Sequence, residues 1–278
     1  MKNIAYQGVP GAYSHIACKE NFPEDNYISC YSFSDAMNAV HNKDADLALI
    51  PVENSEAGRV TDVHFLLPKS DLYIIGEAFL SVHHQLLGLK GTNINDIKEV
   101  FSHAQALAQC RVFLEKNKIT PIQYIDTAAS CEKILKNQDK SQAAIASKLA
   151  AELYNLEVIA EDIETAANNT TRFLIMAPTP QIPEPEEGKK YITSILFKAR
   201  NIPAALYKAL GGFATNAINI TKLESYLENG RFVSASFYLE AEAHPEQQAW
   251  KNALEELKFF ASDIHILGTY AANPFRYK

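Results

Sequence analysis

The sequence is poor in the residue types that build thiolate metal sites and disulfide frameworks. Its 278 residues include only four cysteines, Cys18, Cys30, Cys110 and Cys131, which stand far apart without a CxxC pair. A zinc site made of thiolates is therefore not expected, and a chain of this length does not need disulfides to hold a core. We expect all four cysteines to be reduced thiols that line the core or a cleft.

Long apolar runs and long runs of one charge are also missing. The N-terminal stretch MKNIAYQGVPGAY lacks the apolar segment of a secretory signal, and no run approaches the length of a membrane span. The formal net charge of −7 is spread along the chain, which argues against nucleic acid or an anionic membrane as a partner. We therefore expect a cytoplasmic protein. A hydrophobic content of 47% is typical of a globular chain.

A proline-rich segment divides the sequence. Residues 177–190, APTPQIPEPEEGKK, contain four prolines and almost no bulky apolar residue. Proline stiffens such a segment and removes backbone donors, so the segment is typical of a linker. We predict a first domain over residues 1–177, a linker over 178–190 and a second domain over 191–278.

In the first region, short apolar runs alternate with helical patterns. The predicted strands cover residues 3–6, 47–52, 99–103, 122–126 and 143–147. A helical pattern follows each of them except 47–52, which is followed by the polar segment ENSEAG. One of these helical patterns covers residues 104–116 without a break. The repeated strand–turn–helix order predicts an α/β fold with mostly parallel sheets. In such folds, ligands bind beyond the carboxyl ends of the strands.

The second region has the pattern of one compact unit. Predicted strands cover residues 191–200, 216–226, 231–243 and 263–271, with helices over 203–214 and 246–261 and a turn over 228–230. Pro203 suits the first position of its helix. The order βαββαβ predicts a ferredoxin-like arrangement.

Four strand–helix turns of the first region are rich in small and polar residues. They cover residues 8–15, 51–55, 102–105 and 126–130. Small residues let a ligand approach the backbone, and a helix N-terminus offers N–H groups to anions. Alternatively, Ser14, Ser102 and Thr127 could simply cap helices. Four such turns in one α/β unit favour a binding cleft.

A fifth polar segment precedes an apolar run. Residues 168–173, NNTTRF, bring two threonines and an arginine to the start of a strand that is expected to be buried. Arg172 could be an ordinary solvated residue at this strand entry. Alternatively, its guanidinium could hold a carboxylate through two parallel hydrogen bonds beside a threonine hydroxyl.

These five segments resemble, in the same order, the motifs of the prephenate dehydratase family. GVPGAYSH is similar to the family's GxxGx(Y/F)SH, and PVENSEAGRV to its P(I/V)EN(S/T)xxGxV. SHAQALAQC is similar to SHxQxxxQC, and the DTAAS turn to a threonine-alanine-alanine motif. The segment over residues 169–173 resembles the NxTRF signature. The resemblance covers the whole chain, because the βαββαβ unit that follows is similar to an ACT domain.

The resemblance implies both a fold and an activity. The fold would be α/β, with a two-lobed catalytic domain like a periplasmic binding protein and a ferredoxin-like ACT regulatory domain. The activity would be the decarboxylation and dehydration of prephenate to phenylpyruvate in phenylalanine biosynthesis. By matching positions, the catalytic residues would be Thr171 and Arg172. The substrate-binding residues would be Ser14, Asn54, Ser55, Ser102, Gln105, Gln109, Thr127, Ala128 and Phe173.

This chemistry needs neither a metal nor an organic cofactor. Loss of carbon dioxide and a ring hydroxyl makes an aromatic ring, so the substrate supplies the driving force. We expect the Thr171 hydroxyl to stabilise the departing oxygen by a hydrogen bond rather than by full proton transfer. His83 and His84 do not suggest a metal site, because adjacent residues do not share a face and no carboxylate pattern surrounds them in sequence.

Three further polar residues in the motifs are expected to have structural roles. His15 and His103 could each orient the turn that contains it. Glu53 could act as a base, but we favour a role in holding Asn54 and Ser55 in place.

The resemblance also implies a regulatory ligand and an oligomer. ACT domains of this family bind phenylalanine, here through Ala204, Leu206, Asn219, Glu224 and Ser225, and pair into a homodimer or homotetramer. The family's usual GALV and ESRP motifs are AALY and ESYL in this chain. These departures leave the strength and the sign of the phenylalanine effect open.

Two other functions remain open at this stage. Arogenate dehydratase acts on the aminated analogue of the same ring, and the sequence does not separate the two substrates. A non-catalytic small-molecule sensor is a different class, and the Thr171 hydroxyl argues against it because binding alone does not require that group. We expect no chorismate mutase domain upstream, because the first predicted strand begins near residue 3.

Overall fold

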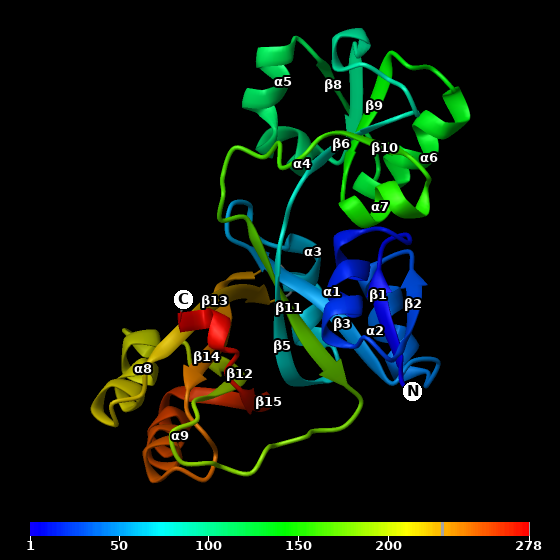
Figure 1. The fold of residues 1–278 in the computed structure, drawn as a ribbon. Helices are drawn as coiled ribbons and strands as arrows, with labels where there is room; N and C mark the ends of the chain where they lie inside the picture. Colours follow the sequence, from blue (N-terminus) through cyan, green and yellow to red (C-terminus); the bar gives the residue numbers. More distant parts are fainter. Residues whose placement is uncertain (229–230, 278) are drawn as a thin grey trace. The chain divides into compact units, whose positions relative to one another are not determined.

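A computed structural model of the chain describes residues 1–228 and 231–277 (Figure 1). The chain divides into two compact units. Unit 1 contains Met1–His64 and Ala78–Phe173, and unit 2 contains Phe65–Glu77 and Leu174–Lys278. The sequence-based domain boundaries near residue 177 stay a prediction.

The first sheet of the chain has six strands in the order β2-β1-β3-β11-β5, with β4 paired to β3. The strands are β1 (Asn3–Gln7), β2 (Asn26–Cys30), β3 (Leu47–Asn54), β4 (Gly58–Arg59), β5 (Tyr73–Ser81) and β11 (Thr170–Ala177). The helices between them are α1 (Tyr13–Asn21), α2 (Phe33–His41) and α3 (Thr61–Leu66). Strand β1 pairs in parallel with both β2 and β3. The part of this layer within unit 1 is called the first lobe.

The second lobe of unit 1 is built on a five-stranded sheet of order β10-β6-β9-β7-β8. Its strands are β6 (Gln85–Gly88), β7 (Glu99–Ser102), β8 (Thr120–Gln123), β9 (Gln142–Ala146) and β10 (Glu157–Ala160). Its helices are α4 (Ala104–Gln109), α5 (Arg111–Asn117), α6 (Thr127–Asn137) and α7 (Lys148–Leu153). Strand β7 is parallel to β8 and β9, whereas β6 is antiparallel to β9 and β10. The predicted α/β class is confirmed.

Two local predictions for this lobe were wrong. The pattern over residues 104–116 forms two helices, because Cys110 leaves helical geometry with ψ 8° while its side chain stays fully buried. Strand β8 ends at Gln123 rather than at residue 126, because the Asp126 carboxylate accepts from the amides of Ala128 and Ala129 and caps α6.

The chain crosses between the two lobes twice. Residues 82–84 lead from β5 to β6, and residues 161–169 lead back from β10 to β11. The crossings are hydrogen-bonded to one another, from Val82 N to Asn169 O over 2.8 Å and from Ile163 N to His84 O over 2.9 Å. We call them the first and second crossing.

Unit 2 contains the βαββαβ order that the sequence predicts. Its elements are β12 (Tyr191–Ala199), α8 (Ala205–Thr215), β13 (Ile220–Glu228), β14 (Arg231–Glu242), α9 (Gln248–Phe260) and β15 (Ala261–Ala271). The sheet is antiparallel in the order β13-β14-β12-β15. This is a ferredoxin-like arrangement. The predicted turn at residues 228–230 lies mostly outside the described residues.

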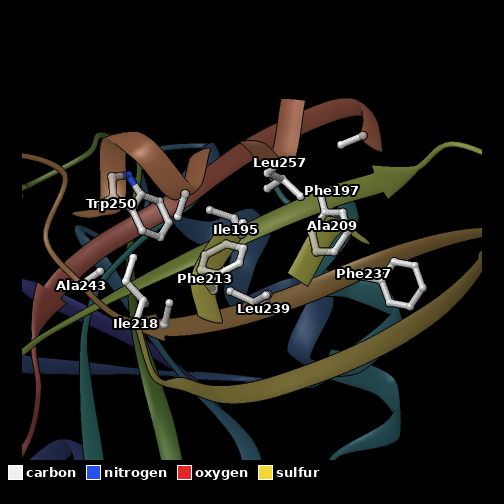
Figure 2. Packing of buried hydrophobic residues seen from close by; sticks show 13 residues of the cluster. Ile195, Phe197, Ala209, Phe213, Ile218, Phe237, Leu239, Ala243, Trp250 and Leu257 are labelled. Atoms are coloured by element: carbon white, nitrogen blue, oxygen red, sulfur yellow. The ribbon is translucent and has the colours of Figure 1, made fainter. Parts of the chain in front are cut away.

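Side chains of α8, α9 and the four-stranded sheet form one buried core (Figure 2). Phe213 of α8 and Trp250 of α9 meet edge to face, with ring centroids 6.0 Å apart. They pack on Ile195 and Leu239, which point from the sheet into the same core. Helix α8 begins at Ala205 rather than at Pro203, because Ala204 adopts a left-handed conformation with φ 58° and ψ 27°.

All four cysteines are free thiols. Within residues 1–228 and 231–277, no helix combines the length and the apolar character that a membrane crossing needs.

Candidate functional site

A cavity of about 510 Å³ lies in unit 1 and takes its walls from both lobes. Seven of the substrate-site residues predicted from sequence line it: Ser14, Asn54, Gln105, Gln109, Thr127, Thr171 and Phe173. Other polar or charged side chains of the same wall belong to Tyr13, Arg59, Asp62, His84, His103 and Asp126. These residues come from six distant sequence segments and meet at one site.

The part of the cavity wall that contains Tyr13 and Ser14 depends on two glycines in the turn after β1. Gly8 has φ 115° and Gly11 has φ 94°, conformations that L side chains rarely adopt. A Cβ on Gly11 would also approach Ala150 Cα to 3.0 Å. This turn begins α1 so that Tyr13 and Ser14 face the cavity.

Three amide side chains form a closed ring of hydrogen bonds beside the cavity. Asn54 Nδ2 donates to Asn169 Oδ1 over 2.7 Å, and Asn169 Nδ2 donates to Gln109 Oε1 over 3.1 Å. Gln109 Nε2 closes the ring onto Asn54 Oδ1 at 3.5 Å. Asn54 Oδ1 also accepts from the amides of Glu56 and Ala57. Because every amide is bound on both sides, the ring fixes the orientation of each side chain. We call these three residues the amide ring.

The amide ring orients Thr171. Asn54 Nδ2 donates a second hydrogen bond, over 3.0 Å, to Thr171 Oγ1. The threonine oxygen therefore acts as an acceptor toward the protein, and its own hydrogen is available to a group in the cavity. The arrangement can present a hydrogen-bond donor at a fixed point to an oxygen that gains negative charge.

A histidine and a tyrosine extend the network from Gln109. His84 Nε2 lies 2.8 Å from Gln109 Oε1, and His84 Nδ1 lies 2.6 Å from the Tyr13 hydroxyl. Burial lowers the pKa of His84 below its usual value, and burial also raises the pKa of Tyr13 well above its usual value. Both groups are therefore neutral near pH 7. Gln109 Oε1 can only accept a hydrogen bond, so the imidazole hydrogen of His84 is on Nε2. His84 Nδ1 is therefore the ring nitrogen that accepts.

The structure places Arg172 away from the cavity. Arg172 is only 4% exposed, and its Nη1 lies 2.8 Å from Glu53 Oε1. Successive residues of a strand point to opposite faces, so on β11 Thr171 and Phe173 face the cavity while Arg172 faces away. The sequence-based expectation that Thr171 and Arg172 act side by side on one ligand disregarded this alternation. Glu53 pairs with Arg172, a contact that the sequence analysis did not anticipate. Its expected role in holding Asn54 and Ser55 in place stays a prediction.

Three other residues of the predicted substrate site hold the scaffold together. Ser102 Oγ donates to Ile145 O over 2.7 Å and ties β7 to β9. Ser55 Oγ donates to Asn168 O over 2.8 Å, which joins two of the motif segments. The amide of Ala128 is bound by the carboxylate of the α6 cap. None of the three is among the described residues that line the cavity.

The alternative that Ser14, Ser102 and Thr127 simply cap helices is also wrong. The N-cap of α1 is Ala12, and that of α4 is His103, whose Nδ1 accepts from Gln105 N. The N-cap of α6 is Asp126. Ser14 and Thr127 thus lie one or two residues inside their helices, where their hydroxyls can face the cavity.

Sequence reasoning missed several residues of this site, and four of them show why. Asn169 stands inside the NxTRF segment and could have been found there. Tyr13 lies in the GVPGAYSH motif, but its partner His84 lies in the first crossing, outside any motif. Arg59 occupies a variable position of the PVENSEAGRV motif, so no pattern marks it. It is the one arginine or lysine among the described residues of the cavity wall.

The predicted phenylalanine-binding residues lie in two parts of unit 2. Ala204 and Leu206 are at the start of α8, and Asn219, Glu224 and Ser225 lie before and along the edge strand β13. Glu224 Oε1 lies 3.8 Å from Lys222 Nζ.

The fold and the cavity define an α/β protein with a two-lobed small-molecule site. The family model described as prephenate dehydratase matches residues 4–181. A bifunctional N-acyl-homoserine lactone acylase/prephenate dehydratase from Komagataeibacter europaeus is 44% identical over 99% of this chain and 98% of its own length. The chloroplastic arogenate dehydratase/prephenate dehydratase 2 of Arabidopsis thaliana is 38% identical over 96% of this chain and 72% of its own length.

A solved structure agrees with these sequence matches. The prephenate dehydratase of Arthrobacter aurescens, in complex with L-Phe, is 27% identical and superposes with a TM-score of 0.89 over 97% of this chain and 90% of its own. The chain belongs to the prephenate dehydratase family and is, as a member, a carbon–oxygen lyase.

Proposed function

We propose that this chain converts prephenate to phenylpyruvate, carbon dioxide and water, with Thr171 as the residue that assists the departing hydroxyl. The bond between the ring and its carboxylate breaks, and its electron pair enters the ring. The bond to the ring hydroxyl then breaks with its electron pair on oxygen, which takes up a proton and leaves as water. The product ring is aromatic, so the protein needs to hold the geometry and stabilise the leaving oxygen.

One observation carries this proposal: the 3.0 Å hydrogen bond from Asn54 Nδ2 to Thr171 Oγ1 in a cavity of about 510 Å³. A hydroxyl whose oxygen already accepts a hydrogen bond from the protein can turn its own hydrogen toward the substrate. A fixed donor of this kind is worth about 10²–10³ in rate when it acts on a developing oxyanion. The burial of Phe173 on the same strand face supplies an apolar surface for the ring.

Arg59 is a better candidate than Arg172 for binding a carboxylate of the substrate. Prephenate carries two carboxylates, and Arg59 is exposed on β4 at the cavity wall. Arg172 is buried against Glu53, which offsets its charge. The hydroxyls of Ser14 and Thr127, and the amide of Gln105, can hold the remaining oxygens by neutral hydrogen bonds.

A coupled assay with the purified protein tests the proposal. Formation of phenylpyruvate from prephenate is measured beside the same assay with arogenate, which would yield phenylalanine. We expect turnover of prephenate, and the ratio of the two kcat/KM values gives the preference between the substrates. No turnover of either ring by the folded protein would contradict the proposal.

We also propose that phenylalanine regulates the enzyme by binding to unit 2 as an ACT domain in a cytoplasmic homo-oligomer. The βαββαβ sheet of unit 2 and the L-Phe complex of the Arthrobacter aurescens relative support this. Calorimetry with phenylalanine, together with sedimentation of the protein with and without it, tests binding and assembly separately from activity.

Amide hydrolysis of an N-acyl-homoserine lactone is a second candidate function. The relative with 44% identity over 99% of this chain is described as bifunctional, with this acylase activity. Phe33 and the exposed Ile125 line the cavity beside its polar wall and would suit an acyl chain. Chromatographic detection of free homoserine lactone and the fatty acid from such a substrate tests it. Retained dehydratase turnover without any acylase product would exclude it.

A further inference from the structure

The two crossings between the lobes bring a histidine and two carboxylates together. His83 lies in the first crossing, and Asp162 and Glu164 lie in the second, about eighty positions later in the sequence. One ligand atom of each side chain lies within 4.8 Å of the others. Figure 1 shows the two links that carry these residues, one between β5 and β6 and one between β10 and β11.

The two separations from His83 match those that a metal ion imposes between its ligands. His83 Nδ1 lies 3.1 Å from Glu164 Oε1 and 3.4 Å from Asp162 Oδ1. Ligands held about 2.1 Å from a tetrahedral zinc ion stand about 3.4 Å apart. A cation between the three groups could therefore bind them with small side-chain rotations.

The three groups carry an excess of negative charge. Two carboxylates face one imidazole, so even a protonated imidazole would leave a net charge of −1. The Glu164 side chain is only 5% exposed, which makes an uncompensated charge there costly. A divalent cation would offset both carboxylates at once.

The outer contacts of the cluster hold its ligands in place. The second carboxylate oxygen of Glu164, Oε2, accepts from His84 N over 2.8 Å, which leaves Oε1 toward His83. Gln85 Nε2 donates to Asp162 Oδ1 over 3.2 Å, and Gln85 Oε1 accepts from Asp162 N over 3.3 Å. Such hydrogen bonds to ligating carboxylates are common around metal sites.

We propose that His83, Asp162 and Glu164 form a binding site for a divalent transition metal, with zinc as the ion that fits best. One imidazole nitrogen and two carboxylate oxygens are ligands that zinc accepts, and water would complete the tetrahedron. The sequence pointed away from a metal because His83 and His84 are adjacent and their surroundings in sequence hold no carboxylates. The carboxylates come from the other crossing. This site is separate from the proposed dehydratase chemistry and does not depend on it.

A bound ion would link the two crossings, so we expect it to stabilise unit 1. It would also lie next to the cavity, since Glu164 contacts the backbone of His84, whose ring is part of the cavity wall. The direct consequence is a rise in the melting temperature of the full chain when zinc is added.

The test uses the full chain after removal of metals with a chelator. Calorimetry and thermal melting are measured with zinc chloride, and in parallel with manganese and magnesium chloride. We expect one zinc ion per chain, a higher melting temperature, and weaker binding of magnesium. His83→Ala and Asp162→Asn each remove one ligand from the cluster and should weaken zinc binding at least about tenfold.

Two matched variants control for general effects. His41→Ala removes an exposed histidine at the end of α2, and Glu161→Gln removes a carboxylate adjacent to the cluster that instead lies 3.6 Å from Lys148. Both should bind zinc like the unchanged chain. Absence of zinc binding, or equal losses in the cluster variants and in the control variants, would overturn the proposal.

Discussion

Asn54 and Thr171 are joined by a hydrogen bond of 3.0 Å although 117 residues separate them in the sequence. The bond brings the end of β3 to the start of β11, which are the PVENS and NTTRF segments. Asn54 is in turn held by Asn169 and by two backbone amides. The orientation of one hydroxyl thus depends on a network that spans most of unit 1.

Replacement of Thr171 tests that hydroxyl directly. We expect Thr171→Val, which keeps the shape of the side chain but removes the oxygen, to lower kcat about 10²–10³-fold with little change in KM. Thr171→Ser should retain most of the activity, because it keeps the oxygen. Steady-state kinetics with prephenate gives both values. A raised KM at unchanged kcat would make Thr171 a binding residue only.

Arg59 and Arg172 should respond differently to loss of charge. We expect Arg59→Gln to raise KM at least about tenfold while the stability changes little, because the charge that meets the substrate is lost from an exposed site. Arg172→Gln should instead lower the melting temperature, because it leaves Glu53 without its buried partner. Kinetics and thermal melting are measured on both variants. If Arg172→Gln raised KM without lowering the melting temperature, Arg172 would be a substrate-binding residue after all.

Stability should fall as the pH is lowered, partly through His84. Burial lowers the pKa of this histidine in the folded chain below 6.5, its ordinary value. Protonation therefore favours the unfolded chain, so the stabilising effect is complete above pH 6.5 and is lost as the pH falls toward the folded-state pKa. Urea denaturation at several pH values measures the slope. His84→Gln should make the slope shallower, whereas an unchanged slope would assign it to other groups such as His15.

Arg276 links two buried carboxylates in unit 2. Its Nε lies 2.6 Å from Glu77 Oε1 and its Nη2 lies 2.8 Å from Glu240 Oε2, and both glutamate side chains are at most 1% exposed. We expect Arg276→Ala to cost about 3–5 kcal/mol in the free energy of unfolding, because the ion pairs of Arg276 with two buried carboxylates are lost.

An exposed ion pair provides the control. Lys258 Nζ lies 2.6 Å from Glu255 Oε1 on the surface of α9. Lys258→Ala should cost less than about 1 kcal/mol. Chemical denaturation of both variants measures the contrast, and similar losses would contradict it.

Ala204 is expected to be a strained residue at the start of α8. Its φ of 58° and ψ of 27° lie in the left-handed region, which costs a residue with a Cβ about 1–2 kcal/mol relative to glycine. We expect Ala204→Gly to stabilise the chain by about 1 kcal/mol. Ala205→Gly, at the first helical position, should instead destabilise the chain by up to about 1 kcal/mol, the penalty of a glycine in a helix interior. Thermal melting distinguishes them, and calorimetry with phenylalanine on Ala204→Gly shows whether the methyl group weakens binding.

The sequence by itself determined the family and, for the second region, the order of the elements. The five motif segments and the βαββαβ pattern are local, because hydrophobic periodicity and turn residues act over a few positions. The start of α8 and the break at Cys110 were not visible, since a helix boundary depends on backbone conformations that packing imposes. The strand alternation that separates Thr171 from Arg172 could have been read from the sequence, because it follows from the strand period alone.

Only the tertiary structure decided which polar residues meet. The amide ring joins residues 54, 109 and 169, and the zinc site proposed here joins residues 83, 162 and 164. Arg59 and His84 lie in the cavity wall, although no motif marks their positions in the sequence. Contacts of this kind depend on how two sheets and two crossings are arranged in space. A one-dimensional pattern does not contain that information, because hydrogen bonds and charges act over a few ångströms in space and not along the chain.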